Sequence, residues 1–402
     1  MKIGINASFL RKQNNGIGQV TTNFLKKLVE ISNDNLQDDG QLSNEKNIYF
    51  IYLEEDVDLE LPENFHKVIF LPFWKRDDLI RKIWWEMISL PKKVKENECD
   101  ALLSLYQCPT VLRNMLRNKN KTKHVMVVHD LIPRLFPQYL NNWRKKVYQS
   151  LSERAIKKAD KILVVSHRTE KDLIKHLGID ASKISVNYID VDEIYKKEVS
   201  QEKLAEVLKK YNLKSGYIYN GGGLEVRKNT ENVLRAYQIL KENFGKASWL
   251  PKLVISGKLM PQLAPLVCDV ESLVKGLALE EDVVVLDWVP QEDLPALYRN
   301  AAVFIFPSHY EGFGVPVLEA MSQGVPVITA KTSSLPEVGA DTILYCNPDD
   351  VDDLAMVMKN VLTSNHLQAS LSLKGYERAR RFSWNKFTGK TIDIIQELGG
   401  RK

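Results

Sequence analysis

Cysteine is scarce in this chain of 402 residues, and long apolar runs are absent from it. Its four cysteines form no C-x-x-C pair and have no histidine at metal-ligand spacing; they are Cys99, Cys108, Cys268 and Cys346. This excludes a disulfide scaffold and a zinc module, and it fits a reducing compartment. Residues 1–6 lack the basic and apolar pattern of a secretory signal. No run reaches the roughly 18 apolar residues of a membrane span, so neither feature is expected.

The rest of the composition is ordinary. Hydrophobic residues make up 44% and charged residues 27%, which is typical of a soluble globular protein. The length fits two domains better than one. The net charge is only +5, but residues 71–158 hold nineteen Lys or Arg against eight Asp or Glu, so the remainder of the chain is net acidic.

This basic region also carries tryptophan. Asp78–Lys95 mixes Trp84, Trp85 and aliphatic residues with lysine and arginine. Further basic residues follow at Arg113, Arg117, Lys119, Lys121, Lys123, Arg144, Lys145 and Lys146. A basic surface that bears tryptophan is typical of proteins that lie on anionic membranes. The alternative is that the tryptophans are core residues and the lysines are simply solvated; the concentration of charge in one region favours the membrane.

Short apolar runs alternate with helical patterns in both halves of the chain. We expect strands at 2–6, 48–53, 67–71, 101–105, 125–128, 161–166, 184–187, 217–219, 253–256, 283–286, 303–306 and 325–328. Helical patterns include 22–31, 192–213, 230–240, 315–323 and a last helix from Trp384, whereas the polar segment Asn33–Asn47 is expected to be a surface loop. This alternation predicts an α/β fold with two facing doubly wound, Rossmann-like domains and a cleft between them. The boundaries are expected after residues 191 and 384.

The stretch from Ala301 to Ile328 predicts a ligand site. A buried strand ends at Pro307, a glycine-containing loop follows, and a helix then begins at Val315. Ligands of open α/β sheets bind beyond the carboxyl ends of strands, and helix starts favour negative charge. Glu311 in the loop and Glu319 in the helix are eight residues apart, so both carboxylates could accept hydrogen bonds from one ligand rich in hydroxyls. Taken singly, each could equally be a solvated surface glutamate.

A second glycine-rich loop follows the expected strand 217–219. It contains Gly222 and ends in the adjacent Arg227 and Lys228. Glycines permit close approach of a ligand to the backbone, arginine binds phosphate with two hydrogen bonds, and lysine adds a point charge. The combination fits a diphosphate group, although an isolated basic pair is usually a solvated helix start.

Two weaker signals lie in the first half of the chain. Gly16 and Gly18 come between the first strand and the first helix, which fits either a cradle for phosphate or sugar or a plain turn. His129 directly follows the expected strand 125–128, where its ring could exchange a proton or a hydrogen bond with a ligand. A single histidine is more often structural.

The string from Glu311 to Glu319 resembles the Glu-x7-Glu signature of retaining GT-B glycosyltransferases of family four. The resemblance extends over essentially the whole chain, from the His129-Asp-Leu-Ile-Pro motif to Arg227-Lys-Asn and Ser334-Leu-Pro-Glu. It implies that Glu311 and the backbone of Phe313, Gly314 and Val315 hold the donor sugar, that Glu319 binds the ribose, and that Arg227 and Lys228 bind the diphosphate. It also places Gly16, Gly18, Gly222 and Ser334 near phosphate and His129 near the reacting centre, with residues 385–402 returning to the N-terminal domain.

The resemblance implies a retaining transfer of a hexose from a nucleotide diphosphate sugar. The sequence around His129 resembles the corresponding motif of bacterial mannosyltransferases of surface polysaccharide or lipopolysaccharide synthesis. This makes GDP-mannose the first expectation for the donor. UDP-glucose and UDP-N-acetylhexosamines stay open. A soluble acceptor also stays open. Two other functions stay open for the chain as a whole: a sugar-nucleotide epimerase of the same fold, and a relative that only binds its ligand.

The expected partners are the nucleotide sugar, a saccharide acceptor and an anionic membrane surface, with no nucleic acid. The basic region favours a lipid-linked acceptor and a peripheral location on the cytoplasmic face of the cell membrane. We expect no cofactor and no metal, because no Asp-x-Asp lies in the cleft motifs and the Arg227–Lys228 pair can take the place of a metal ion.

Overall fold

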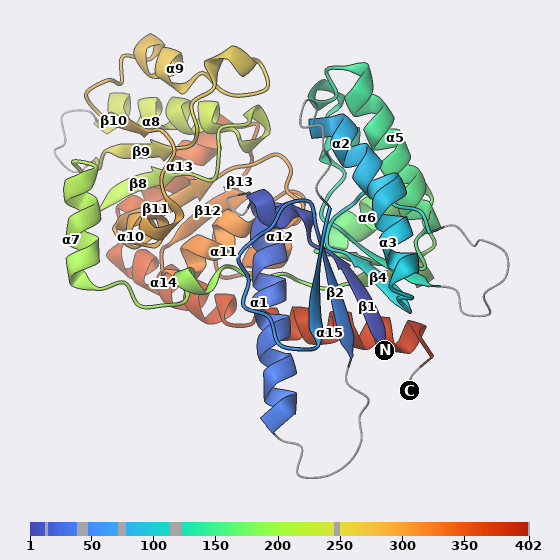
Figure 1. Cartoon of the computed structure of the whole chain (residues 1–402). Coiled ribbons are helices and arrows are strands. Elements are labelled where there is room, and N and C mark those ends of the chain that lie inside the picture. The colour runs from blue at the N-terminus through green and yellow to red at the C-terminus, as the bar shows by residue number, and fades with distance from the viewer. Residues whose placement is uncertain (13–14, 38–46, 71–77, 113–121, 245–249, 401–402) are drawn as a thin grey trace. The chain divides into compact units, whose positions relative to one another are not determined.

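The computed structural model describes residues 1–12, 15–37, 47–70, 78–112, 122–244 and 250–400. It divides into two units: Met1–Ile189 with Ser383–Lys402 form the N-terminal unit, and Asp190–Phe382 form the C-terminal unit (Figure 1). Each division lies two residues before the expected one. Asp190 belongs to the second unit because its carboxylate pairs with Lys196, and Ser383 belongs to the first because it is the N-cap of the last helix.

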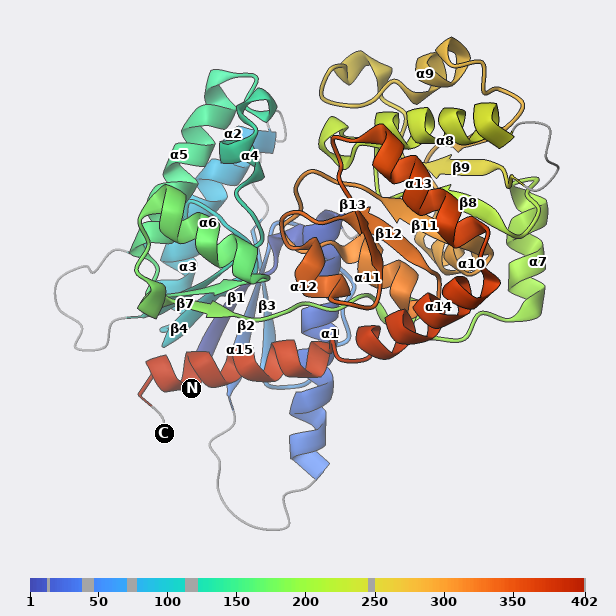
Figure 2. The same cartoon turned by 180° about the vertical axis from the view of Figure 1, so that it is seen from behind.

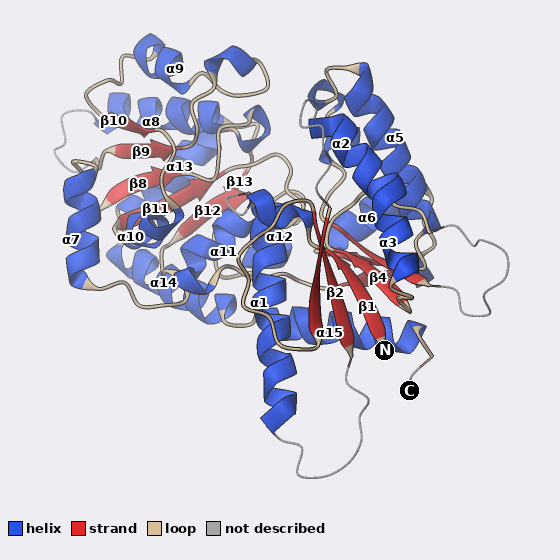
Figure 3. Ribbon diagram, in the orientation of Figure 1, coloured by secondary structure: helices blue, strands red, loops and turns tan. Residues whose placement is uncertain are grey.

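A parallel sheet forms the centre of the N-terminal unit, with its strands red in Figure 3. In the described residues its order is β3-β2-β1-β4-β5-β6-β7, so the chain moves one way from β1 to β3 and the other way from β4 to β7. The strands are β1 (Lys2–Asn6), β2 (Ile48–Leu53), β3 (Phe65–Ile69), β4 (Ala101–Ser104), β5 (Lys123–Val128), β6 (Lys161–Val164) and β7 (Ile184–Val186). β1 and β2 have the expected bounds, β3 begins and ends two residues before the expected 67–71, and the others differ from expectation by one or two residues at one end.

Helices cover both faces of this sheet. The side chains of Met126, Val128 and Ile162 pack beneath α5 and α6, while Tyr52 and Leu102 pack beneath α3. On the other face α1 and α15 lie together (Figures 1 and 2), with the rings of Phe24 and Phe387 6.1 Å apart. The helices are α1 (Gly16–Gln37), α2 (Asp78–Trp84), the π-helical turn η2 (Trp85–Ser89), α3 (Leu90–Glu96), α4 (Ile132–Leu135), α5 (Trp143–Lys158), α6 (His167–Leu177) and α15 (Trp384–Leu398).

The C-terminal unit has a second parallel sheet, whose order within the described residues is β10-β9-β8-β11-β12-β13. Its strands are β8 (Tyr217–Asn220), β9 (Leu253–Ser256), β10 (Val283–Leu286), β11 (Ala301–Phe306), β12 (Val327–Ala330) and β13 (Leu344–Cys346). One face packs on α8, α9 and α13 through residues such as Ile218, Ile255 and Ile305. The helices are α7 (Gln201–Lys210), α8 (Thr230–Phe244), α9 (Val270–Gly276), α10 (Leu294–Arg299), α11 (Val315–Ser322), α12 (Leu335–Gly339), α13 (Val351–Leu362) and α14 (Asn365–Ala379).

Some expected elements differ more clearly from the structure. The helix expected over 192–213 is a short 3-10 turn, Glu193–Tyr195, followed by α7, because Ser200 caps the new helix by accepting from the N–H of Lys203. The strand expected at 325–328 is displaced to Val327–Ala330, since Pro326 has no N–H for the ladder. The expected loop Asn33–Asn47 is wrong over its first five residues, because α1 continues to Gln37. Residues 38–46 of that loop, and the basic residues between Arg113 and Lys121, lie outside the described residues.

Across the ranges that the structure describes, no helix is long and apolar enough to cross a lipid bilayer.

Candidate active site

The order of the second sheet predicts a ligand site between β8 and β11. The chain direction across the sheet reverses at this pair, because β9 lies outside β8 and β12 lies outside β11. Such switch points open a crevice at the carboxyl ends of the two strands. The loops that leave β8 and β11 there contain Gly222, Arg227, Lys228 and Glu311, four of the residues predicted to bind substrate.

A direct ion pair joins the two loops. Arg227 Nη1 donates to Glu311 Oε1 over 2.5 Å and to the carbonyl of Tyr310 over 2.8 Å. Ser308 Oγ also donates to Glu311 Oε1 over 3.0 Å, and the N–H of His309 donates to the carbonyl of Arg227 over 2.8 Å. The guanidinium and the carboxylate are therefore fixed by each other, although 84 residues separate them.

Two serines hold the backbone of the Glu311 loop. Ser333 Oγ accepts from the Glu311 N–H over 2.9 Å, and Ser334 Oγ donates to the carbonyls of Glu311 (2.8 Å) and Phe313 (2.9 Å). Ser334 is fully buried. Its hydroxyl positions the loop in this structure, and its expected contact with phosphate stays a prediction.

The glycine loop after β8 lies against the start of α11. Gly222 has a φ of +94°, and a Cβ atom there would come within 2.8 Å of Pro316 Cγ, so only glycine fits. Lys228 Nζ donates to the carbonyl of Gly222 and pairs with Glu225 at 3.2 Å. The ammonium group is therefore held over the loop, and its stem is buried.

Glycine also sets the geometry at the start of α11. Gly314 is the N-cap residue and has a φ of +104°, which favours glycine. No described residue accepts a hydrogen bond from the N–H groups of Gly314 or Val315, as expected for the first turn of a helix. Phe313 is buried and packs edge-on against Phe382. The helix start can therefore offer N–H donors to an anion or a sugar hydroxyl.

Glu319 lies one turn into α11 and is only 7% exposed. Tyr298 OH donates to its Oε2 over 2.9 Å. Burial raises the pKa of this carboxyl group to about 7, and the bond from Tyr298 and the charge of Lys228 oppose the shift. Glu319 can therefore gain or lose a proton near neutral pH.

His129 lies in the N-terminal unit, directly after β5. Its Nε2 lies 2.8 Å from the carbonyl oxygen of Leu105, so this nitrogen carries the proton and Nδ1 can act as an acceptor. Thr169 Oγ1 donates to the His129 carbonyl over 3.1 Å. Burial lowers the pKa of the imidazole, which keeps the ring uncharged at neutral pH.

Gly16 and Gly18 form the first turn of α1. Asn15 caps this helix, because its Oδ1 accepts from the N–H of Gly18 over 2.7 Å. Gly16 is exposed, and no heavy atom lies within 4 Å of a Cβ placed there. Neither crowding nor left-handed backbone requires glycine at residue 16, and the role of both glycines in substrate binding stays a prediction.

The sequence pattern did not identify several residues that shape the site. Glu225, Ser308, Ser333 and Tyr298 each contact a predicted residue across a long stretch of chain or a turn. Asn229 belongs to the Arg227-Lys-Asn motif, but no role was predicted for it: its φ is +65°, and its Nδ2 donates to the carbonyls of Pro307 and Pro348. Only Asn229 had a signal, since asparagine tolerates left-handed backbone. In the part of the chain that the structure describes, no three His, Cys, Asp or Glu side chains gather in a way that could hold a metal ion.

Two family models match most of the chain. Residues 45–193 match the model described as Glycosyltransferase Family 4, and residues 200–378 match the model described as Glycosyl transferases group 1. The O-antigen chain mannosyltransferase B of Escherichia coli is 33% identical over 275 residues, which cover 68% of this chain and 70% of that protein. The serotype-specific mannosyltransferase WbdA of Escherichia coli is 31% identical over 69% of this chain, but the match spans only 34% of WbdA.

The fold also matches solved structures. The crystal structure of WaaG, a glycosyltransferase involved in lipopolysaccharide biosynthesis, aligns with a TM-score of 0.71 at 16% identity and covers 98% of this chain and 99% of that one. This likeness confirms the expected GT-B fold.

Proposed function

Because the chain belongs to glycosyltransferase family 4, we propose that it is a retaining hexosyltransferase that moves mannose from GDP-mannose to a saccharide acceptor in surface polysaccharide assembly. Mannose is supported by the names of the two relatives, which are both mannosyltransferases. One observation carries the proposal: the ion pair of Arg227 and Glu311 and the start of α11 lie at the switch point of the same sheet.

In the proposed mechanism the C-terminal unit binds the donor. Arg227 and Lys228 bind the diphosphate and neutralise the charge that builds on it as the glycosidic bond breaks. The N–H groups of Gly314 and Val315 and the carboxylate of Glu311 orient the sugar hydroxyls, and Glu319 accepts hydrogen bonds from the ribose.

The remaining steps concern the acceptor. We propose that it attacks on the face that the diphosphate leaves, and that the leaving phosphate oxygen takes its proton, so the anomeric configuration is retained. His129 assists near the anomeric carbon as an uncharged hydrogen-bonding group. The reaction is proposed to need no cofactor and no divalent metal, since Arg227 and Lys228 supply the positive charge.

Thermal unfolding with a panel of nucleotides tests the proposal. GDP and GDP-mannose are expected to stabilise the wild-type protein by about 2.7 kcal/mol at a hundredfold excess over Kd, and UDP and UDP-glucose much less. The shift is expected to vanish in Arg227→Ala. Arg235→Ala is a matched control, because Arg235 is an exposed arginine on α8 that also pairs with a glutamate, Glu231. A shift with UDP ligands alone would remove mannose from the proposal, and no shift with any nucleotide would remove the transferase.

Product analysis separates the proposal from an epimerase of the same fold. An epimerase alters the nucleotide sugar without an acceptor, whereas a transferase needs one. We expect NMR spectra to show no new sugar nucleotide when GDP-mannose is incubated with the enzyme alone, and an α-linked product when an acceptor is added.

We further propose that the N-terminal unit lies on an anionic membrane and takes a lipid-linked acceptor. Exposed apolar and basic side chains gather on two neighbouring segments, which are joined where Tyr148 OH donates to Glu86 Oε2 over 2.9 Å. The tryptophan surface, as we name it, consists of Ile80, Trp84, Met87, Ile88, Trp143, Arg144, Lys145, Lys146 and Val147. Trp143 is 70% exposed. Exposing so large an apolar side chain to water is unfavourable unless another surface covers it.

The tryptophan surface is expected to govern liposome binding. The double variant Trp84→Ala, Trp143→Ala should bind vesicles with anionic lipid at least tenfold more weakly, because each tryptophan would bury a large apolar area in the membrane. Trp288→Ala is the matched control, since Trp288 is 57% exposed but belongs to the C-terminal unit. Cosedimentation at low and high salt measures both effects, and binding should fall with salt. Equal binding of the tryptophan variant and the wild type would contradict the proposal.

A further inference from the structure

The N-terminal unit has a pocket that the proposed donor site does not use. It has a volume of about 190 Å³ and is lined by Ser8, Phe9, Arg11, Lys12, Glu54, Leu79 and Lys82. The first four follow β1 and Glu54 follows β2, so the pocket opens beyond the carboxyl ends of these strands. The direction of the chain across the sheet reverses between β1 and β4, which makes this edge the position where open α/β sheets bind ligands.

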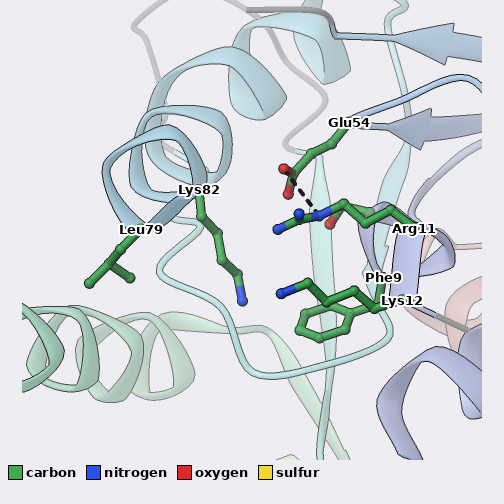
Figure 4. Close-up of a pocket in the computed structure, with 7 residues that line it drawn as sticks. Phe9, Arg11, Lys12, Glu54, Leu79 and Lys82 are labelled. Atoms are coloured by element: carbon green, nitrogen blue, oxygen red, sulfur yellow. Dashed lines mark ion pairs between the residues drawn. The ribbon is translucent and has the colours of Figure 1, made fainter. Parts of the chain in front are cut away.

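Three positively charged groups point into the pocket. Figure 4 shows the ends of Arg11, Lys12 and Lys82 directed toward the same space, with the Phe9 ring beside them and Leu79 turned away. The carboxylate of Glu54 lies at the edge of this space and is already shared: Arg11 Nε lies 3.5 Å from its Oε2 and Arg81 Nη2 lies 3.2 Å from it. The lining therefore has more positive than negative charge.

Lys82 is held in place without a full countercharge. Its Nζ lies 4.5, 5.0 and 5.1 Å from the ring centroids of Phe9, Tyr106 and Tyr148, within the range of cation–π attraction. The carboxylate of Glu86 is 3.8 Å away, beyond hydrogen-bonding distance. The aromatic rings thus fix the ammonium group at the pocket before any ligand arrives.

Glu86 compensates this charge only in part. The side chain is fully buried and accepts from Tyr106 OH over 2.6 Å and from Tyr148 OH over 2.9 Å. Burial raises the pKa of the carboxyl group and so opposes its ionisation, and its two oxygens are engaged by the tyrosine hydroxyls and not by Lys82. Arg11 and Lys82, which are held by their neighbours, and the nearby Lys12 therefore face a space large enough for a small anion.

We propose that this pocket binds the phosphate of a phosphate ester or diphosphate through Arg11, Lys12 and Lys82. Phosphate suits the site because an arginine fork and two ammonium groups can engage several of its oxygen atoms at once. The ring of Phe9 lies beside the cations and can pack against the group that the phosphate carries. A phosphate that belongs to the acceptor would enter here during transfer, and this assignment of the source rests on the proposed function; a free phosphate anion is the other source of the same chemistry.

Calorimetry with inorganic pyrophosphate tests the binding itself. The protein used is Arg227→Ala with Lys228→Ala, so that the proposed donor site does not contribute. In this background Lys82→Met with Lys12→Met is expected to weaken pyrophosphate binding at least tenfold, because methionine keeps the stem but removes the charge. Lys92→Met is the matched control, since Lys92 is an exposed lysine on α3 that lies 3.8 Å from Glu96. Absence of pyrophosphate binding in the background protein, or equal binding in all variants, would overturn the proposal.

A second measurement identifies the source of the phosphate. The wild-type enzyme is given two acceptors with the same saccharide, one carrying a diphosphate ester and one without it. If the phosphate belongs to the acceptor, kcat/KM is expected to be at least tenfold higher for the diphosphate, and Lys82→Met should remove this preference. Equal use of both acceptors would overturn the assignment to the acceptor and leave a free anion as the ligand. Since calorimetry needs no turnover, failure of the transferase proposal and failure of the pocket give different results.

Discussion

Replacing Arg227 with alanine is expected to lower kcat about a thousandfold, the loss typical when one preorganised group that stabilises transition-state charge is removed. The side chain points into the switch-point site and is held by Glu311 and by the carbonyl of Tyr310. Without it, charge on the departing diphosphate has only Lys228 opposite. The buried carboxylate of Glu311 would also lose its partner and repel the donor.

The ion pair between Arg227 and Glu311 predicts a non-additive result when both residues are changed. Glu311→Gln alone is expected to lower kcat about a hundredfold, and the double variant should lose less than the product of both factors, because groups in contact are not additive. Steady-state rates with GDP-mannose and a saccharide acceptor measure all three variants, and Arg235→Ala should stay within about twofold of wild type. If Arg227→Ala kept more than about a tenth of the wild-type rate, Arg227 would not stabilise the leaving group.

Nucleotide binding is expected to weaken as the pH falls through about 7 in the wild-type protein and to lose this dependence in Glu319→Gln. The pKa of Glu319 is raised from 4.5 to about 7 by burial. Below that pH the carboxyl group holds a proton and is a poorer acceptor for ribose hydroxyls, so GDP should bind roughly tenfold more weakly one unit below the pKa than well above it. Calorimetric titration with GDP across this range measures the change.

Removal of the whole side chain gives the larger effect. Glu319→Ala is expected to raise the Kd for GDP about a hundredfold, because two ribose hydroxyls lose a charged acceptor and Tyr298 loses its partner. Tyr298→Phe is the control, since it deletes only the phenol that bonds Glu319. A Kd for GDP in Glu319→Ala within about threefold of wild type would place the ribose elsewhere.

The sequence predicted those parts of the fold that depend on local pattern. The strands at 2–6, 48–53, 253–256 and 283–286 have the expected bounds, because each is a short apolar run between turns. The start of α1 was missed, since its two glycines were read as a loop while Asn15 in fact caps a helix that begins at Gly16. A cap made by one side chain can override the weak helix propensity of glycine.

The site was predictable by residue type but not by pairing. Arg227 and Glu311 each stood out in a motif, yet their ion pair depends on β8 and β11 being neighbours in a sheet, which no local pattern encodes. The same limit applies to the pocket in the N-terminal unit. Arg11, Glu54 and Lys82 come from three separate segments, and nothing near any of them in the sequence indicates a shared space.

The division of the chain has a consequence for its synthesis. The N-terminal unit is discontinuous, because α15 lies against α1 and Asn187 Nδ2 donates to the carbonyl of Phe387 over 2.9 Å. The C-terminal unit is continuous over Asp190–Phe382. Domains that emerge from the ribosome usually fold in order from the N-terminus. The N-terminal unit therefore keeps one face of its sheet incompletely covered until residues 383–402 are made. All of the C-terminal unit has been synthesised before that point, although it follows the first strands of the N-terminal unit in the chain.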